Sequence, residues 1–412
     1  MKILAFQGYR YAAAAGNAEP LAAPPFDQID DRRQRELHAA SPHQFAHLTR
    51  PTGEGVAAAL RSSESHAAWI ASGVVMRDQE PALYPYAISL PEGGRRLGLC
   101  CLVGVDHGQA GDLRPHEHTV DKPLADRLAL LEATRVDYEP VFLLADDDGS
   151  FERALAEEVE RLQPVARHTD PLRGDHHVIY RLDDPARVRR FQTLLASRGA
   201  TIADGHHRTK VAQLFASRHQ VPPGTAAAAK LAVLTSVTSP GLTIDPIHRA
   251  VQASLSQEVL AGLAVRRTSL PDARDGATVA RAVDSAAQPS VGVRFAGAPP
   301  EIWLLDPNAV PANTPGREAG LAVVALHHQL LAAALGPNAA SDGTVVYKAD
   351  PDAIWQQVTD GEATAGFWLP SMSPESFALA TRDGSVLPPK STRFLPKLVS
   401  GLVWCGHDAR TA

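Results

Sequence analysis

The sequence predicts an α/β protein with a mixed sheet, and three observations lead to this class. The 412 residues, 44% of them hydrophobic, are enough for two or three packed units. Short apolar runs alternate along the chain with segments of helical periodicity, which is typical of α/β proteins. Two strand-like runs, at 82–90 and 97–105, flank the turn-forming residues 91–94 (Pro-Glu-Gly-Gly), which predicts a hairpin. We therefore expect a mixed sheet rather than a uniformly parallel one.

The period of the apolar residues assigns the other elements in chain order. Residues 54–72 predict a helix, because Val56, Leu60, Ala67 and Ile70 recur at roughly helical spacing. The other expected elements are a strand at 3–6, a Pro-rich loop at 20–27, an irregular loop at 107–119, a helix from about residue 122, a buried strand at 141–144, a loop or linker at 221–228, a strand-like run at 229–249, a helix at 321–335 and a strand at 366–369.

The most informative segment is residues 204–208, Asp-Gly-His-His-Arg. It follows the apolar run 201–203 and precedes the helical run 211–216, which predicts the order strand, tight turn, helix. Such a turn directs backbone N–H groups and the positive end of a helix dipole to one place, which suits an anion. Gly205 permits the tight backbone, and the planar fork of Arg208 matches phosphate oxygens. The segment is interpreted as a phosphate-handling turn; the alternative is an ordinary surface turn before a helix.

The remaining side chains of this turn add acid–base chemistry. His206 and His207 can donate hydrogen bonds or transfer protons near neutral pH. Asp204 can hold a divalent cation or accept a proton.

A second candidate is the run 115–119, Pro-His-Glu-His-Thr, within the expected loop. Its carboxylate, Glu117, can serve as a general base whose pKa is tuned by His116 and His118. Two alternatives stay open. Glu117 could simply cap a following helix, or the His-x-His spacing could bind zinc, although spacing identifies no third ligand.

A cationic cluster near the carboxyl end suits phosphate recognition. Lys390, Ser391, Thr392, Arg393 and Lys397 bring three cations and two hydroxyls into eight residues. The cluster lacks the glycine spacing of a Walker loop, and its alternative is a solvated charged turn.

Three further residues could contribute to substrate binding. Asp27 follows two prolines, and it could orient an acceptor amine or a metal, or could merely initiate a turn. His248 and Arg249 follow a Pro-containing turn and could approach the pocket that contains the phosphate-handling turn. The histidine pairs at 176–177 and 327–328 are interpreted as structural or surface features.

Composition excludes several classes of protein. A net charge of −6 without a long basic run argues against nonspecific DNA binding. The three cysteines indicate no disulfide framework, and Cys100 and Cys101 lie in an apolar run that predicts a buried strand. We expect a cytoplasmic protein, because no signal peptide or apolar run of membrane-spanning length is present.

Five stretches together resemble a family related to free serine kinases, formerly described as a domain of unknown function, within the ParB/sulfiredoxin-like superfamily. They occur in the expected order across nearly the whole chain: 23–27, 115–119, 202–208, 240–242 followed by His248-Arg249, and 388–398. The resemblance implies a ParB/sulfiredoxin-like phosphate-binding core with additional α/β elements. It also implies a kinase of a free hydroxy amino acid, most simply L-serine, that uses a nucleotide or pyrophosphate as donor.

The resulting hypothesis is a small-molecule kinase with a catalytic region at 1–250 and a C-terminal α/β region at 251–412. The alternatives are a ParB-like nucleotide-binding regulatory module and a metal-dependent hydrolase. We expect Mg²⁺ and a donor that is ATP, ADP or pyrophosphate, no nucleic acid and no membrane as partners. The assigned roles are: catalysis for Glu117, Asp204 and His207; donor binding for Gly205, His206, Arg208, Lys390, Ser391, Thr392, Arg393 and Lys397; substrate binding for Asp27, His116, His118, His248 and Arg249; metal binding for Asp204 and Glu117.

Overall fold

The structure, a computed structural model, describes residues 1–105, 112–117, 124–336 and 343–412, and it contains two compact units. Unit 1 comprises Met1–Pro115, Thr119–Leu242 and Pro396–Ala412, and unit 2 comprises His116–His118 and Thr243–Leu395. The chain therefore passes between the units more than once, whereas the sequence prediction of regions 1–250 and 251–412 has a single boundary.

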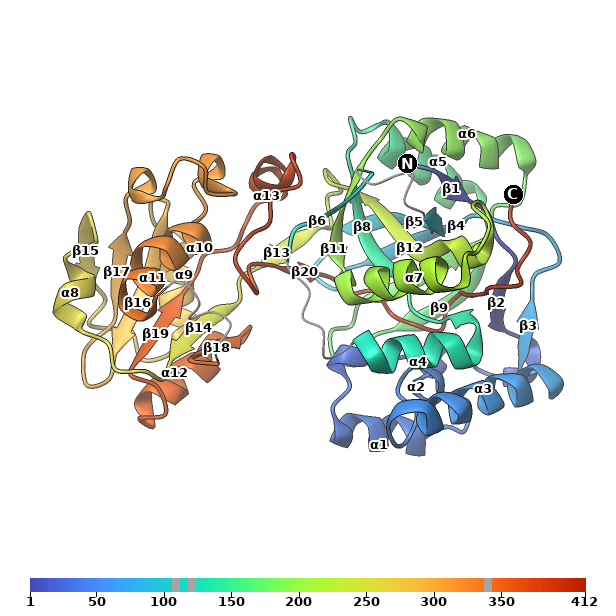
Figure 1. Cartoon of the computed structure of the whole chain (residues 1–412), viewed down its shortest axis with the longest axis horizontal. Helices are drawn as coiled ribbons and strands as arrows, with labels where there is room; N and C mark the ends of the chain where they lie inside the picture. The colour runs from blue at the N-terminus through green and yellow to red at the C-terminus, as the bar shows by residue number, and fades with distance from the viewer. Residues whose placement is uncertain (106–111, 118–123, 337–342) are drawn as a thin grey trace. The chain divides into compact units, whose positions relative to one another are not determined.

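Unit 1 is built on a nine-stranded mixed sheet (Figure 1). The pairs β6–β11 and β8–β12 are parallel, and the other pairs are antiparallel, which confirms the predicted mixed sheet. The hairpin is also confirmed, because β4 and β5 pair from Tyr84 opposite Cys100 to Ser89 opposite Arg95. The strand order is β6 (Leu113–Pro115), β11 (Ala200–Asp204), β8 (Val141–Ala145), β12 (Ala229–Ser236), β5 (Arg95–Gly104), β4 (Tyr84–Ser89), β10 (His176–Tyr180) and β9 (Pro164–Thr169), with β1 (Ile3–Leu4) on β5.

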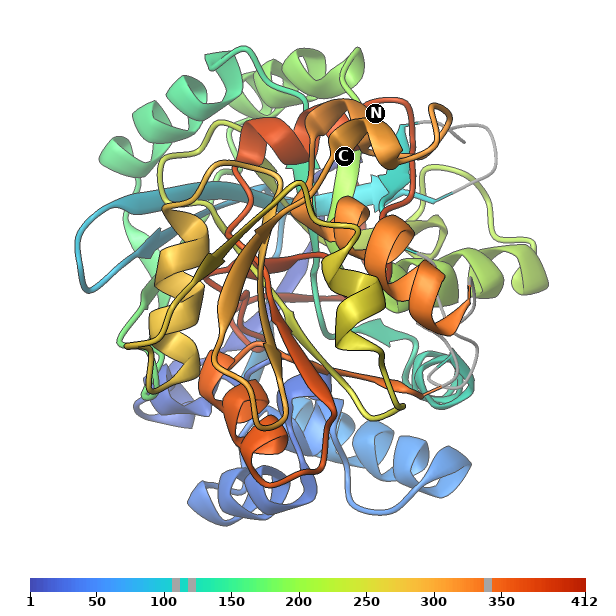
Figure 2. The same ribbon diagram turned by 90° about the vertical axis from the view of Figure 1, so that its left-hand side faces the viewer.

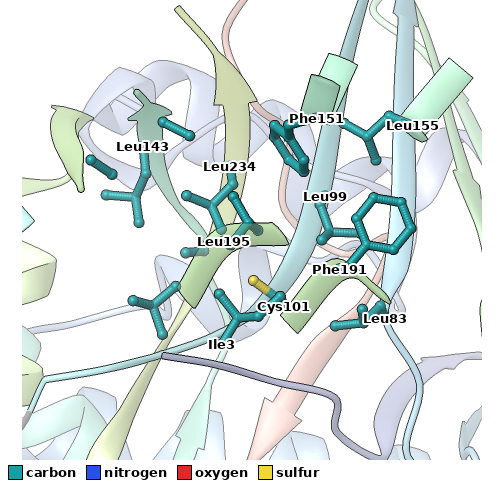
Figure 3. Packing of buried hydrophobic residues seen from close by; sticks show 14 of the residues in the cluster. Ile3, Leu83, Leu99, Cys101, Leu143, Phe151, Leu155, Phe191, Leu195 and Leu234 are labelled. Atoms are coloured by element: carbon teal, nitrogen blue, oxygen red, sulfur yellow. The ribbon is translucent and has the colours of Figure 1, made fainter. Parts of the chain in front are cut away.

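One face of this sheet packs against α5 (Ser150–Arg161) and α6 (Pro185–Ala196) (Figure 1). Aromatic side chains of both helices interlock with aliphatic residues of the strands (Figure 3). Each such buried side chain contributes about 1.5–3 kcal/mol relative to exposure. All three cysteines are buried and unpaired, and Cys101 lies in this core, as its apolar run predicted. The labelled core residues are Ile3, Leu83, Leu99, Cys101, Leu143, Phe151, Leu155, Phe191, Leu195 and Leu234.

The opposite side of the sheet carries α4 (Leu124–Thr134) and α7 (His206–His219), which pack against each other (Figure 1). Leu131, Val211 and Phe215 form the buried cluster between them. Helix α3 (Gly55–Ala71), predicted from its periodicity, packs on α4. The remaining elements of unit 1 are α1 (Asp31–Ala40), α2 (Ala46–Thr49) and the small sheet β3 (Val75–Arg77), β2 (Gly8–Tyr11), β21 (Trp404–Gly406) and β7 (Val136–Asp137).

Unit 2, coloured yellow to red in Figure 2, has a six-stranded antiparallel sheet. Val279, Ile354 and Trp368 are central to its core. The strand order is β15 (Arg266–Ser269), β17 (Glu301–Leu304), β16 (Ser290–Phe295), β19 (Ala365–Trp368), β14 (His248–Val251) and β18 (Val345–Lys348). Its other elements are the β13 (Thr243–Asp245) and β20 (Arg393–Leu395) pair and the helices α8 (Gln257–Ala261), α9 (Gly276–Asp284), α10 (Ala322–Ala325), α11 (Ala332–Leu335), α12 (Pro351–Thr359) and α13 (Pro374–Thr381).

Two expectations need correction. The segment expected as an irregular loop contains a strand, because 113–115 pair with β11 as β6; residues 106–111 and 118–123 lie outside the described part. The helix expected at 321–335 is present from residue 322 to residue 335, but Leu326–Leu331 form a π-helix between α10 and α11. In the described ranges, the helices are too short or too polar to cross a membrane.

Candidate functional site

The predicted strand, tight turn and helix are present in unit 1. Strand β11 ends at Asp204, Gly205 adopts a left-handed φ of 98°, and α7 begins at His206. Glycine is required here for two reasons, because a Cβ would be strained at this φ and would lie 2.6 Å from Cγ1 of Val141. Gly205 occupies the N-cap position of α7 and has no side chain with which to cap the helix.

Asp204 is held by two cations. Lys397 Nζ lies 2.6 Å from its Oδ2, and Arg208 Nη2 lies 3.4 Å from its Oδ1. Burial alone raises the pKa of Asp204, but Lys397 and Arg208 outweigh it and lower the pKa to about 2. The carboxylate is therefore ionised at neutral pH and is a weak proton acceptor.

Arg208 faces inward. Its Nη1 donates to the carbonyl oxygen of Pro140 at 2.6 Å, so the guanidinium ties the turn to the start of β8. In the described conformation its fork contacts Asp204 and Pro140, and its role as a phosphate ligand remains a prediction. His206 and His207 are partly buried in the first turn of α7.

A buried charged network that the sequence analysis missed lies behind this turn. Glu139 accepts a hydrogen bond from Phe26 N at 3.0 Å and faces Arg127 at 3.8 Å. Lys230 pairs with Asp137 and donates to Glu139 O at 2.7 Å. One signal was available, because Lys230 is a lone charge within an apolar strand.

The electrostatics of Glu139 connect this network to the turn. Burial raises the pKa of Glu139, and the positive charges of Arg208 and Arg127 oppose that rise. The negative charge of Asp27 also raises the pKa of Glu139, so this exposed residue lies within electrostatic reach of Glu139. Asp27, the predicted acceptor-amine ligand, is thus near the phosphate-turn network.

The network borders a small cavity of about 50 Å³ under α7, lined by Arg127, Glu139, Arg208, Lys230 and Phe215 among others. A space of this size holds a few water molecules. The cavity is therefore too small for a nucleotide.

Two of the predicted motifs meet inside unit 2. His116 is buried, and its Nε2 lies 2.8 Å from the hydroxyl of Thr392. The rings of Phe377 and Phe394 contact His116 edge-on. These contacts join residues that are 276 positions apart in the sequence. Lys397, by contrast, is the part of the predicted cationic cluster that belongs to unit 1.

Arg249 contacts the unit 2 loop that contains Pro389 and Lys390. It is fully buried, and its Nη2 donates to the carbonyl oxygens of Pro389 at 3.2 Å and Lys390 at 2.9 Å. Burial lowers the pKa of Arg249 to about 10, and the charge of Tyr347 and, to a smaller extent, that of partly buried Glu117 oppose this fall. The neighbouring His248 accepts from Leu369 N at 3.1 Å, and burial lowers its pKa to about 4.

The other predicted residues of unit 2 have structural contacts. Ser391 donates to Pro388 O at 2.5 Å, and Arg393 lies opposite Asp245 in the β13–β20 pair. His118, a predicted substrate ligand, lies outside the described residues.

The predicted metal ligands do not form a metal centre in the described ranges, which contain no group of three or more His, Cys, Asp or Glu side chains suited to a metal ion. Both carboxylate oxygens of Asp204 already contact cations. The assignment of Asp204 and Glu117 as ligands of Mg²⁺ remains a prediction.

Comparisons with solved structures identify distant likenesses. A conserved hypothetical protein from Pyrococcus furiosus is 12% identical, with a TM-score of 0.35, over 73% of this chain and 94% of its own. A free serine kinase in complex with AMP is 14% identical, with a TM-score of 0.36, over 72% and 87%. SbnI with a C-terminal truncation, from Staphylococcus aureus, is 13% identical, with a TM-score of 0.37, over 72% and 84%. No curated protein sequence matches the chain.

A family match covers most of the chain. Residues 3–295 match the family described as "Protein of unknown function (DUF1015)". The match includes the turn at 204–208, Glu117 and Arg249, and it ends before the motif at 388–398. The chain therefore belongs to the DUF1015 family.

Proposed function

We propose that this protein is a small-molecule phosphotransferase that phosphorylates the hydroxyl of a free amino acid, with L-serine as the acceptor. The observation that carries the proposal is the turn from β11 into α7, in which Gly205 adopts a left-handed φ of 98° directly before the amino end of the helix. The N–H groups at the amino end of a helix and the positive end of its dipole favour a phosphate at such a position. The motifs that resemble a free serine kinase-related family support the choice of acceptor.

Two cations lie beside this helix end. Lys397 and Arg208 both contact the carboxylate of Asp204, and Arg208 also interacts electrostatically with Glu139. In this proposal Lys397 and the backbone of 205–207 contact the donor phosphates. Arg208 positions the turn through Pro140, and His206 and His207 border the bound donor.

The base in this proposal is Glu117. As the acceptor oxygen forms its bond to phosphorus, the bond from phosphorus to the donor's leaving oxygen breaks, and the acceptor proton passes to the Glu117 carboxylate. Asp204 is less suited to this role, because a carboxylate with a pKa near 2 and two cationic partners has little affinity for a proton. The chemistry depends on positioning and charge stabilisation, as phosphoryl transfer generally does.

The donor is ATP, ADP or pyrophosphate, and a divalent cation enters the proposal with the donor. Mg²⁺ prefers phosphate oxygens and water, with only one or two protein carboxylates. Asp204 and Glu117 remain its predicted ligands, and no step of the reaction is assigned to it.

A matrix of donors and acceptors tests the proposal. Purified full-length protein is incubated with each donor and with L-serine, L-threonine, L-homoserine or no acceptor, and the phosphorylated amino acid is measured by mass spectrometry. We expect O-phosphoserine that depends on both substrates and is strongly reduced in the E117Q variant. Donor binding by calorimetry without transfer to any acceptor would instead establish a binding module.

A further inference from the structure

The loop at residues 23–28 is fastened to the rest of unit 1 at two points. At the first, Ala23 and Ser400 exchange backbone hydrogen bonds of 3.0 and 2.8 Å. At the second, Phe26 N donates to Glu139 Oε1 at 3.0 Å, and the Phe26 ring lies 4.1 Å from the guanidinium carbon of Arg127. The two residues between Ala23 and Phe26 are prolines, whose φ is fixed. The loop is therefore held in one conformation.

Both fastening points also support the phosphate turn. The first belongs to the carboxyl-terminal segment that carries Lys397, which pairs with Asp204 at 2.6 Å. The second belongs to the start of β8, where Glu139 precedes Pro140 and the carbonyl oxygen of Pro140 accepts from Arg208 at 2.6 Å. All of these residues belong to unit 1. The loop and the turn consequently share the same two supports.

Glu139 provides the only side chain that bonds the loop at the second point in the described ranges. It is 5% exposed, and its Oε2 lies 3.8 Å from Arg127. Its own backbone is fixed as well, because its carbonyl oxygen accepts from Lys230 Nζ at 2.7 Å. Loss of the Glu139 carboxylate would leave a backbone N–H without its acceptor and a buried cation without its anion, and both are costly.

The residue that this loop presents to solvent is Asp27. It directly follows Phe26 and is exposed. In the part of the chain that the structure describes, its carboxylate makes no hydrogen bond or ion pair. Its negative charge nevertheless acts on both Glu139 and Arg208. Asp27 is thus a carboxylate without an internal partner on a fixed loop, and such a group suits a cationic ligand.

We propose that Glu139 is a positioning residue of the candidate site, which holds the loop 23–28 against the phosphate turn and so places Asp27 to bind the ammonium group of the amino acid acceptor. The identity of this ligand rests on the proposed function. An ammonium group beside Asp27 is attracted both by this carboxylate and by the donor phosphates at the turn. The loop and the turn that bind these groups belong to the same unit.

The test compares two probes by calorimetry without donor. L-Serine carries the ammonium group, and 3-hydroxypropionate keeps the hydroxyl and the carboxylate but lacks it. Asp27→Asn removes the charge of the ligand-binding residue. Glu139→Leu removes the support of the loop, whereas Glu139→Gln keeps an oxygen that can accept from Phe26 N. Phe26→Ala loosens the loop and keeps every buried charge, so it replaces Glu139→Leu if that variant does not fold.

Two further variants are the controls, and thermal unfolding shows that each protein is folded. Glu158→Gln removes another buried carboxylate that pairs with an arginine, Arg187, but on the sheet face opposite α7. Asp31→Asn removes an exposed carboxylate near Asp27 in the sequence, which pairs with Arg50 at 3.4 Å.

We expect Asp27→Asn to weaken L-serine binding on the order of 10-fold or more, the usual effect of removing a charged hydrogen-bonding group. Glu139→Leu and Phe26→Ala should weaken it similarly, Glu139→Gln should keep most of the affinity, and both controls should keep all of it. Binding of 3-hydroxypropionate should be weaker than that of L-serine in the wild type and unchanged in every variant.

Three results would overturn the inference. Full affinity of Asp27→Asn for L-serine would remove Asp27 from the site, and absence of L-serine binding by the wild type would remove the site itself. Equal losses for both probes in Glu139→Leu and Phe26→Ala would mean that Glu139 supports only the fold. Failure of the proposed function is distinguishable, since Asp27-dependent binding of L-serine without phosphoryl transfer would refute the kinase and keep the ammonium site.

Discussion

At the residue scale, Gly205 makes the turn of the candidate site possible. The change Gly205→Ala should destabilise the protein by about 1–3 kcal/mol, because the residue has a φ of 98° and the added Cβ would meet Val141 at 2.6 Å. Thermal unfolding measures this loss, and calorimetry should show weaker donor binding. Gly262→Ala is the control, because Gly262 has an ordinary φ and its nearest contact would be 3.4 Å. Equal stability of the two variants would remove the steric argument.

The assignment of the base is a second prediction at this scale. Glu117→Gln keeps the shape and removes the basicity, so we expect a loss of roughly 10²- to 10⁴-fold in turnover with donor affinity nearly intact. Asp204→Asn should chiefly weaken folding, because it leaves Lys397 and Arg208 without their anion. Steady-state kinetics and thermal unfolding of both variants separate these effects. If a folded Asp204→Asn variant is inactive while Glu117→Gln turns over normally, Asp204 is the base.

Single residues also show the limits of reading chemistry from sequence. The sequence placed Gly205 in a tight turn correctly, because the conformation of glycine is a local property. The sequence predicted that Arg208 binds phosphate. In the described conformation its guanidinium donates to the carbonyl oxygen of Pro140, and the phosphate contact stays a prediction. The sequence classed His327 as a structural or surface residue, and that interpretation stays a prediction.

At the scale of one element, α5 carries a carboxyl group that titrates near neutral pH. Burial of Glu152 is the main cause that raises its pKa from 4.5 to about 7, a hydrogen bond from Ser239 opposes the rise, and the charge of Asp147 adds to it. A pKa that is higher in the folded state means that folding takes up a proton. The contribution of protonated Glu152 to the free energy of unfolding is therefore complete below about pH 4.5, and it is lost as the pH rises through 7.

The variant Glu152→Gln should abolish this dependence. We expect the melting temperature of the variant, relative to the wild type, to increase from pH 5 to pH 8. Glu157→Gln on the same helix is the control, because that side chain is exposed and pairs with Arg190. A difference between Glu152→Gln and wild type that stays constant with pH would contradict the raised pKa.

At the scale of the whole molecule, the carboxyl-terminal segment Pro396–Ala412 completes unit 1. Trp404 in β21 is 0% exposed, and Lys397 pairs with Asp204. Trp404→Ala should therefore cost about 3–5 kcal/mol of stability, the usual range for a buried large aromatic residue. Denaturant unfolding of the full-length variant measures the loss. A change below 1 kcal/mol would mean that β21 is dispensable to unit 1.

The requirement for a divalent cation also concerns the whole reaction. Because a polyphosphate donor needs its charge bridged, EDTA should abolish phosphoryl transfer, and Mg²⁺ or Mn²⁺ should restore it. The transfer assay with and without chelator provides the measurement. Full turnover in EDTA would exclude a divalent cation from the mechanism.

The sequence by itself determined the local structure of this protein. The turn at 204–208, the β4–β5 hairpin and helix α3 follow from glycine conformation and from the spacing of apolar residues. Such signals arise between residues a few positions apart, so they survive without knowledge of the fold. They also located most of the polar motifs that the candidate site uses.

Only the tertiary structure decided which of these motifs meet. Asp204 and Lys397 are 193 positions apart, and His116 and Thr392 are 276 positions apart, yet each pair is in contact. The network of Glu139 and Lys230 likewise joins distant segments. Contacts of this kind depend on how the whole intervening chain packs and closes its loops, and no local pattern encodes that outcome.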